Sequence, residues 1–158
     1  MTSARIRTQA HQPARARHRG QALVEFALVA PLFFFLLFAI IDFGRYVYYV
    51  QIINNAAREG ARYAIVHGSN SLCPSGPPAA GSPACDPTGQ RVKDVVRTYA
   101  VGVIGDSTVL VTNPTWDPDN GRESTVTVAV TYDFRSVIPI VPIPAVRITG
   151  GSTLVINN

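Results

Sequence analysis

Residues 15–45 of this chain read RARHRGQALVEFALVAPLFFFLLFAIIDFGR and carry most of the information about its fold. From Ala22 to Ile41 it runs for twenty residues in which the only charge is Glu25. A helix of that length covers about 30 Å, which is the thickness of the hydrocarbon core of a bilayer. The sequence therefore predicts a transmembrane helix over residues 21–43.

Positive charge gathers on the N-terminal side of this segment. The chain has 14 Lys and Arg against 10 Asp and Glu, and five of the arginines, with no acid, lie in residues 1–20. Arginines beside an apolar span mark its cytoplasmic end, so we expect residues 1–20 to be a basic cytoplasmic leader and the rest to lie outside. A short basic tail beside an apolar helix does not indicate a nucleic-acid partner.

A cleaved secretory signal is the first competing interpretation. Such a signal has a shorter apolar core that is followed by a small-x-small cleavage site. Here the segment is followed by Ile41-Asp42-Phe43-Gly44-Arg45 instead. We therefore expect the apolar helix to stay in the protein as a single-pass membrane anchor.

Glu25 needs an explanation of its own. A carboxylate well inside a bilayer costs at least about 2.5 kcal/mol, so such a residue usually has a partner or a function. Glu25 lies about 6 Å along the helix from Gln21, close to the interface. The simplest interpretation is that its carboxylate reaches the lipid headgroups, and the alternative is a role in assembly.

Three motifs resemble the TadE-like family of tight-adherence pilus assembly proteins, a pilin-like group: GQALVEFALVAPL at residues 20–32, IDFGR at 41–45 and AAREGARYA at 56–64. The resemblance implies that a prepilin peptidase cuts after Gly20 on the cytoplasmic side, so that Gln21 becomes the first residue of the mature chain and Glu25 the fifth. It also implies that Glu25 pairs with the freed α-amino group of a neighbouring subunit, an opposite charge that favours the ionised carboxylate.

The same resemblance implies a minor or accessory subunit of a tight-adherence type IV pilus or a related secretion apparatus, in the cytoplasmic (inner) membrane of a bacterium. The implied partners are the prepilin peptidase, a major pilin and other pilin-like subunits, platform proteins of the inner membrane, and the lipid bilayer. Gln21 departs from the aromatic first residue that is common among major pilins, which argues against a place in the body of the filament.

Residues 44–68 are predicted to continue the helix as an amphipathic segment. Only Pro31 interrupts the helical pattern, and a membrane helix tolerates a proline. Asp42 and Arg45 lie one turn apart and should form an ion pair. Small residues recur at every fourth position and would let another backbone approach closely, either that of the chain's own sheet or that of another subunit; they are Ala56, Gly60, Ala64 and Gly68.

Residues 69–158 are predicted to form an extracytoplasmic α+β domain, in which a small antiparallel sheet of about three strands packs on the long helix beside one short helix, as in pilins. Proline and glycine make residues 69–90 a loop, and the apolar spacing in residues 90–100 predicts the short helix. Strands are expected at residues 108–112, 124–134 and 146–156, and Gly150-Gly151 indicates a bulge in the last.

Both cysteines, Cys73 and Cys85, lie in this loop, on the side of the membrane expected to be oxidising. A disulfide between them is the natural prediction. A metal site would need more ligands at suitable spacing, and His67 is the only other candidate nearby, so no metal is expected. His67 itself is expected to end the helix.

Two inserts carry further expectations. The acidic stretch at residues 117–123 has some character of a calcium loop but lacks the full ligand series, and Asn120-Gly121 favours a turn between strands. Residues 137–145 are apolar with three prolines, so they cannot form a central strand. They could cover the sheet, rest on the membrane or meet a partner.

No motif in the chain points to catalysis. The sequence has no phosphate-binding glycine loop, no dinucleotide fingerprint and no His-Glu-x-x-His, and we expect neither an enzyme nor a cofactor. The competing hypothesis for function is an unprocessed, permanently anchored extracytoplasmic binding module. An exported enzyme would require a convergent polar pocket.

Overall fold

A computed structural model describes residues 18–81, 85–104, 109–111, 113–137 and 144–157. The chain divides into two compact units, residues 1–39 and 40–158. Helix α1, His18–Val66, is 49 residues long and passes from the first unit into the second. It continues through Pro31, as the tolerance of membrane helices for proline predicts.

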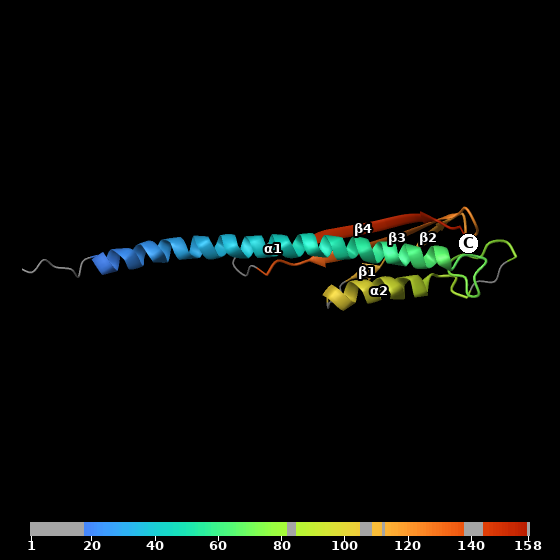
Figure 1. The fold of residues 1–158 in the computed structure, drawn as a ribbon, viewed down its shortest axis with the longest axis horizontal. Coiled ribbons are helices and arrows are strands. Elements are labelled where there is room, and N and C mark those ends of the chain that lie inside the picture. Colours follow the sequence, from blue (N-terminus) through green and yellow to red (C-terminus); the bar gives the residue numbers. More distant parts are fainter. Residues whose placement is uncertain (1–17, 82–84, 105–108, 112, 138–143, 158) are drawn as a thin grey trace, which may run out of the picture. The chain divides into compact units, whose positions relative to one another are not determined.

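The second unit contains a small antiparallel sheet and one further helix (Figure 1). The sheet has two long strands, β3 (Thr125–Phe134) and β4 (Val146–Val155), which pair along their whole length. Two short strands, β1 (Leu110–Val111) and β2 (Thr115–Asp117), pair with β3 as well. The other helix is α2, Gln90–Ile104.

The sheet is three strands wide, because β1 and β2 pair with different parts of the same edge of β3 and β4 pairs with the other edge. Val111 lies opposite Val130 and Thr115 lies opposite Thr127. Three residues therefore separate the two short strands where β3 has only two, so the edge carries one extra residue. The expected three-stranded sheet is confirmed, and the two short strands β1 and β2 together occupy the position of its first strand.

Alternation along β3 builds the core. One face of this strand is buried and consists of Val126, Val128, Val130, Tyr132 and Phe134. The part of α1 that lies in the second unit contributes Ile53 and several alanines, and α2 contributes Val92, Val96 and Ala100. Period-two burial of valine and aromatic side chains is typical of a sheet with one covered face. The predicted α+β packing of the long helix on the sheet is confirmed.

The bulge expected at Gly150-Gly151 is wrong. The pairing of β3 with β4 is unbroken, with Val130 opposite Gly150 and Ala129 opposite Gly151. Gly150 is needed for a different reason: a Cβ there would lie 2.8 Å from Ile53 Cγ2 and 3.1 Å from the backbone nitrogen of Asn54. The glycine lets α1 approach the strand closely.

The loop between α1 and α2 is built around two side chains from the segment before β3. Asn120 is fully buried; its Oδ1 accepts a hydrogen bond from the Ala79 N–H at 2.9 Å, and its Nδ2 donates to the Ser75 carbonyl at 3.4 Å. A Cβ on Gly76, which has φ of 102°, would lie 2.5 Å from the Trp116 ring. The loop is thus packed against the edge of the sheet.

The turn expected within residues 117–123 is confirmed between β2 and β3, although Asp117 itself is the last residue of β2. Asp119 accepts hydrogen bonds from the Gly121 N–H at 2.7 Å and from the Ser124 hydroxyl at 3.0 Å, the local pattern expected of aspartate in a turn. Of the apolar segment 137–145, residues 138–143 lie outside the described residues.

Candidate functional site

The expected processing region lies in the first two turns of α1. Gly20, Gln21 and Glu25 are all exposed, and a Cβ on Gly20 would meet no atom within 4 Å. Since residues four apart in a helix lie on one face, the start of a chain beginning at Gln21 would sit on the same face as Glu25. The bond between Gly20 and Gln21 belongs to the end of a helix, where fraying is common.

The apolar segment behind this region presents its side chains outward. Phe26 and Leu28 are 68% and 74% exposed, and the remaining large apolar residues of the segment are exposed as well. Within the described residues one helix, Gly20–Val66, is long and apolar enough to cross a membrane, and none of its most apolar window is buried in protein. The apolar surface is thus available to lipid or to other helices.

Asp42 lies within the second unit, just after this segment, and is 8% exposed. Its Oδ1 is 3.0 Å from Arg45 Nη1, so the predicted ion pair is confirmed. The carboxylate also accepts hydrogen bonds from the Ser136 hydroxyl and from the Val137 N–H, the latter at 3.1 Å and 3.2 Å. These contacts join α1 to the chain just after β3, and local spacing gave no sign of them because Ser136 is 94 residues away.

Aromatic rings extend this junction. The Arg45 guanidinium carbon lies 5.6 Å from the centre of the Tyr49 ring and 5.5 Å from that of Phe134. Tyr49 also packs edge-to-face on Tyr132, with ring centres 5.4 Å apart. A cation over such rings adds attraction to the burial of the rings themselves. Arg45 therefore contributes to two contacts at once, the ion pair and the aromatic cluster.

The chain's own elements cover the small-residue face. Ala56 and Ala64 are 1% and 0% exposed, and Gly60 and Gly68 are buried. A Cβ on Gly60 would collide with Val96 Cγ2 of α2 and lie 3.3 Å from Val128 Cγ1 of β3. This is the intramolecular alternative for the row, with the glycine where α1, α2 and the sheet meet.

Cys73 and Cys85 are free thiols in this structure, so the expected disulfide is not formed here. The two sulfurs nevertheless interact: a hydrogen bond with Cys73 is the largest cause that raises the pKa of the Cys85 thiol. Neighbouring backbone atoms hold the two segments together, since the N–H groups of Cys85 and Asp86 both donate to the Pro74 carbonyl at 3.1 Å.

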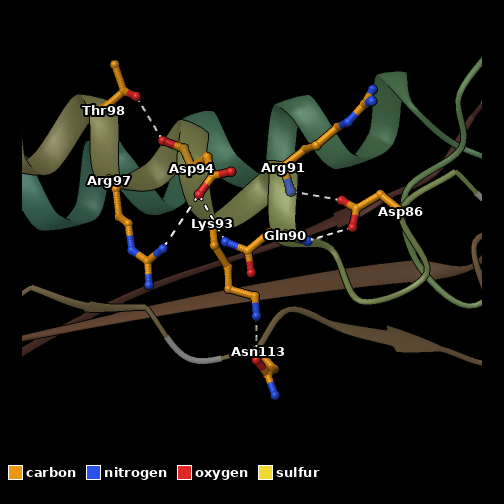
Figure 2. A network of polar contacts seen from close by, with 8 residues as sticks. All are labelled: Asp86, Gln90, Arg91, Lys93, Asp94, Arg97, Thr98 and Asn113. Carbon is orange, nitrogen blue, oxygen red and sulfur yellow. Dashed lines mark hydrogen bonds and ion pairs between the residues drawn. The ribbon is translucent and has the colours of Figure 1, made fainter.

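Polar groups elsewhere are used for structure. Asp86 accepts hydrogen bonds at 2.8 Å from the N–H groups of Gln90 and Arg91, the first residues of α2 (Figure 2). His67 lies just beyond the last residue of α1, and its Nδ1 donates a hydrogen bond to the Tyr63 carbonyl at 2.9 Å, which confirms that it ends the helix. Among the described residues, no three His, Cys, Asp or Glu gather where they could hold a metal ion.

A helix with an exposed apolar end whose continuation packs on a small antiparallel sheet is the architecture expected of pilin-like proteins. The particular family follows from sequence: residues 20–62 match the model of the family described as TadE-like protein, so the chain carries a TadE-like domain in that range. TadE-like proteins are pilus assembly proteins with an N-terminal hydrophobic helix, and they are in general structural rather than enzymatic. No curated protein and no solved structure gave a significant match.

Proposed function

We propose that this chain is a minor pilin-like assembly protein of a tight-adherence type IV pilus or a related secretion apparatus. It inserts with its basic end in the cytoplasm, is cut between Gly20 and Gln21 by a prepilin peptidase, and acts by packing its apolar helix against other subunits. The observation that carries this proposal is that the TadE-like match begins at residue 20, where the leader ends and five residues before the single acid of the apolar segment.

The exposed apolar surface supports the helix-packing part of the proposal. A charge inside a membrane commonly faces a partner, and the new α-amino group of a neighbouring subunit would be a partner of opposite sign for Glu25. The α-amino group of the same chain, on the same helix face, competes for this carboxylate. Pairing between subunits therefore depends on another helix lying close by. The platform proteins of the inner membrane and a major pilin are the further partners that the family suggests.

The first test is the N-terminus of the protein extracted from membranes, measured by intact mass in cells with and without the prepilin peptidase. We expect a chain that begins at Gln21 only when the peptidase is present. Gly20→Leu should block the cut, because it replaces the residue before the scissile bond. Leucine is a good helix former, so the substitution should leave the helix itself intact.

Gly44→Leu is the matched control, since neither glycine has an atom within 4 Å of an added Cβ. It should leave processing intact. A chain that keeps its arginine-rich leader in every strain would overturn the proposal and favour a permanently anchored binding module.

A further inference from the structure

Cys73 and Cys85 form a dithiol site with a charged neighbour. The Nη1 group of Arg91 lies 2.9 Å from Cys73 Sγ, and Cys73 is half-buried whereas Cys85 is exposed. A cation in contact with a cysteine sulfur favours the thiolate, which is the nucleophilic form. The two thiols are therefore not equivalent in their surroundings.

Arg91 is held in place from several sides. Arg91 lies in the first turn of α2, and its backbone N–H donates to the Asp86 carboxylate just before that helix. In Figure 2 the Arg91 side chain extends away from this carboxylate. The pKa of its guanidinium is raised, first by the charge of Cys73 and then by a hydrogen bond with Tyr63 of α1. The arginine thus connects the ends of both helices to one sulfur.

The second thiol, Cys85, has different surroundings. The pKa of Cys85 is raised, first by its hydrogen bond with Cys73, then by partial desolvation and by the charge of Cys73, and Arg91 opposes this shift. Its Sγ also lies 3.9 Å from the Leu72 carbonyl.

We propose that Cys73 is the reactive thiol of this site and takes disulfides as its substrate class, with Cys85 as the resolving thiol and Arg91 as a positioning residue. The Cys73 thiolate attacks one sulfur of an external disulfide, whose S–S bond breaks and releases one thiolate. Cys85 then loses its proton and attacks Cys73 Sγ in the mixed disulfide. The second external thiolate leaves, so two protein thiols lose two electrons and two protons while the external disulfide becomes two thiols.

Backbone contacts already link the two segments that carry the cysteines. The backbones of Ser75 and Asp86 already form a bridge, and the Gly76 N–H donates to the Asp86 carbonyl at 2.8 Å. Closing the bond between the cysteines would add a covalent link beside this bridge and next to the start of α2. The inference is independent of whether the chain is cut after Gly20.

The test uses the reduced full chain in detergent micelles, with glutathione disulfide as the oxidant and intact mass and peptide mapping as the readouts. Cys85→Ser should accumulate one glutathione adduct, located on Cys73. Cys73→Ser should form its adduct on Cys85 about tenfold more slowly. Equal rates for the two single variants, or a faster reaction of Cys85, would overturn the proposal.

The role of Arg91 is tested in the Cys85→Ser background. Arg91→Gln should slow adduct formation about tenfold, and Arg91→Lys should restore most of the rate, because lysine keeps the charge. A purely structural role of the arginine would not be rescued by charge alone. Arg97→Gln, on the same helix and paired with Asp94 at 3.5 Å, is the control and should leave the rate unchanged. If Arg91→Gln reacts as fast as its parent, Arg91 does not act on Cys73.

Discussion

The Asp42 carboxylate, at the end of the apolar part of α1, accepts hydrogen bonds from Ser136 and Val137 just beyond β3. With the Arg45 ion pair, these contacts close the second unit at one end of its sheet. The carboxylate is nearly buried, so its hydrogen-bond partners offset the cost of removing it from water. A short polar cluster thus binds the start of this unit to a segment far along the chain.

Replacing Asp42 should therefore destabilise the second unit. We expect Asp42→Ala to lower the free energy of unfolding by about 1–3 kcal/mol, because three part-buried donors, on Arg45, Ser136 and Val137, lose a charged acceptor. Asp42→Asn should cost less, since the amide keeps one acceptor oxygen. Thermal unfolding of the full chain in micelles, followed by near-ultraviolet circular dichroism, measures this. Asp94→Ala removes a well-exposed partner of Arg97, and a loss as large as that of Asp42→Ala would contradict the prediction.

The two adjacent glycines of β4 should behave differently. Gly150→Ala would place a Cβ against Ile53 and the backbone of Asn54, and we expect it to cost about 1–3 kcal/mol, as overpacked sites do. Gly151→Ala is the matched control, because its Cβ would meet only the Val128 carbonyl at 3.7 Å. The same thermal unfolding measurement compares them. Equal effects would mean that close approach of α1 is not the reason for glycine at position 150.

Substitutions at Gly60 test whether the small-residue face of α1 packs on the chain's own α2 and sheet or on another subunit. Gly60→Ala should lower the unfolding free energy of the isolated chain by about 1–3 kcal/mol, since the new methyl group collides with Val96. Shortening the obstacle with Val96→Ala should make the alanine at position 60 less harmful than it is alone. Gly44→Ala, with no atom near the added Cβ, should be neutral or slightly stabilising. A Gly60→Ala chain of normal stability that fails to assemble would instead indicate a subunit contact.

Asn120 should be essential to the loop between the helices. Asn120→Ala removes the acceptor of the Ala79 N–H and the donor to the Ser75 carbonyl, and we expect a loss of about 1–3 kcal/mol. Limited proteolysis should show faster cleavage within residues 69–81. Asn113→Ala removes an exposed partner of Lys93 and should leave the cleavage pattern unchanged. Identical patterns for the two variants would show that Asn120 does not hold the loop.

Glu25→Gln tests the proposed assembly role. We expect normal membrane insertion and normal cutting after Gly20 but loss of pili or of pilus-dependent attachment, because the amide cannot pair with an α-amino group as an ion. Glu59→Gln makes the same change in the same helix, outside the apolar segment, and should preserve assembly. Pili in normal number with Glu25→Gln would argue that the carboxylate only reaches the headgroups.

Much of this architecture could be read from local pattern. The apolar run of residues 22–41 determines a helix, because in lipid each backbone polar group must be paired within its own segment. Strict alternation from Val126 to Phe134 determines a strand with one covered face, since side chains of a strand point to opposite faces. The three- and four-residue spacing of apolar side chains in residues 90–100 predicts α2 to within a few residues of its observed bounds.

The roles of the unusual residues depend on how the elements pack together. The Gly150-Gly151 pair is typical of a bulge, but Gly150 instead lets α1 approach the strand closely. Asn120 lies in a turn, yet its side chain is buried. Asp42 accepts a hydrogen bond from Ser136, 94 residues away in the chain. Periodicity tells which face a residue occupies, whereas its neighbour across that face depends on the register and distance of elements that are remote in sequence. Local sequence pattern therefore predicts the two helices, the two long strands and their covered faces, but not the short strand β2. The packing of the elements sets the role of each glycine, amide and acid.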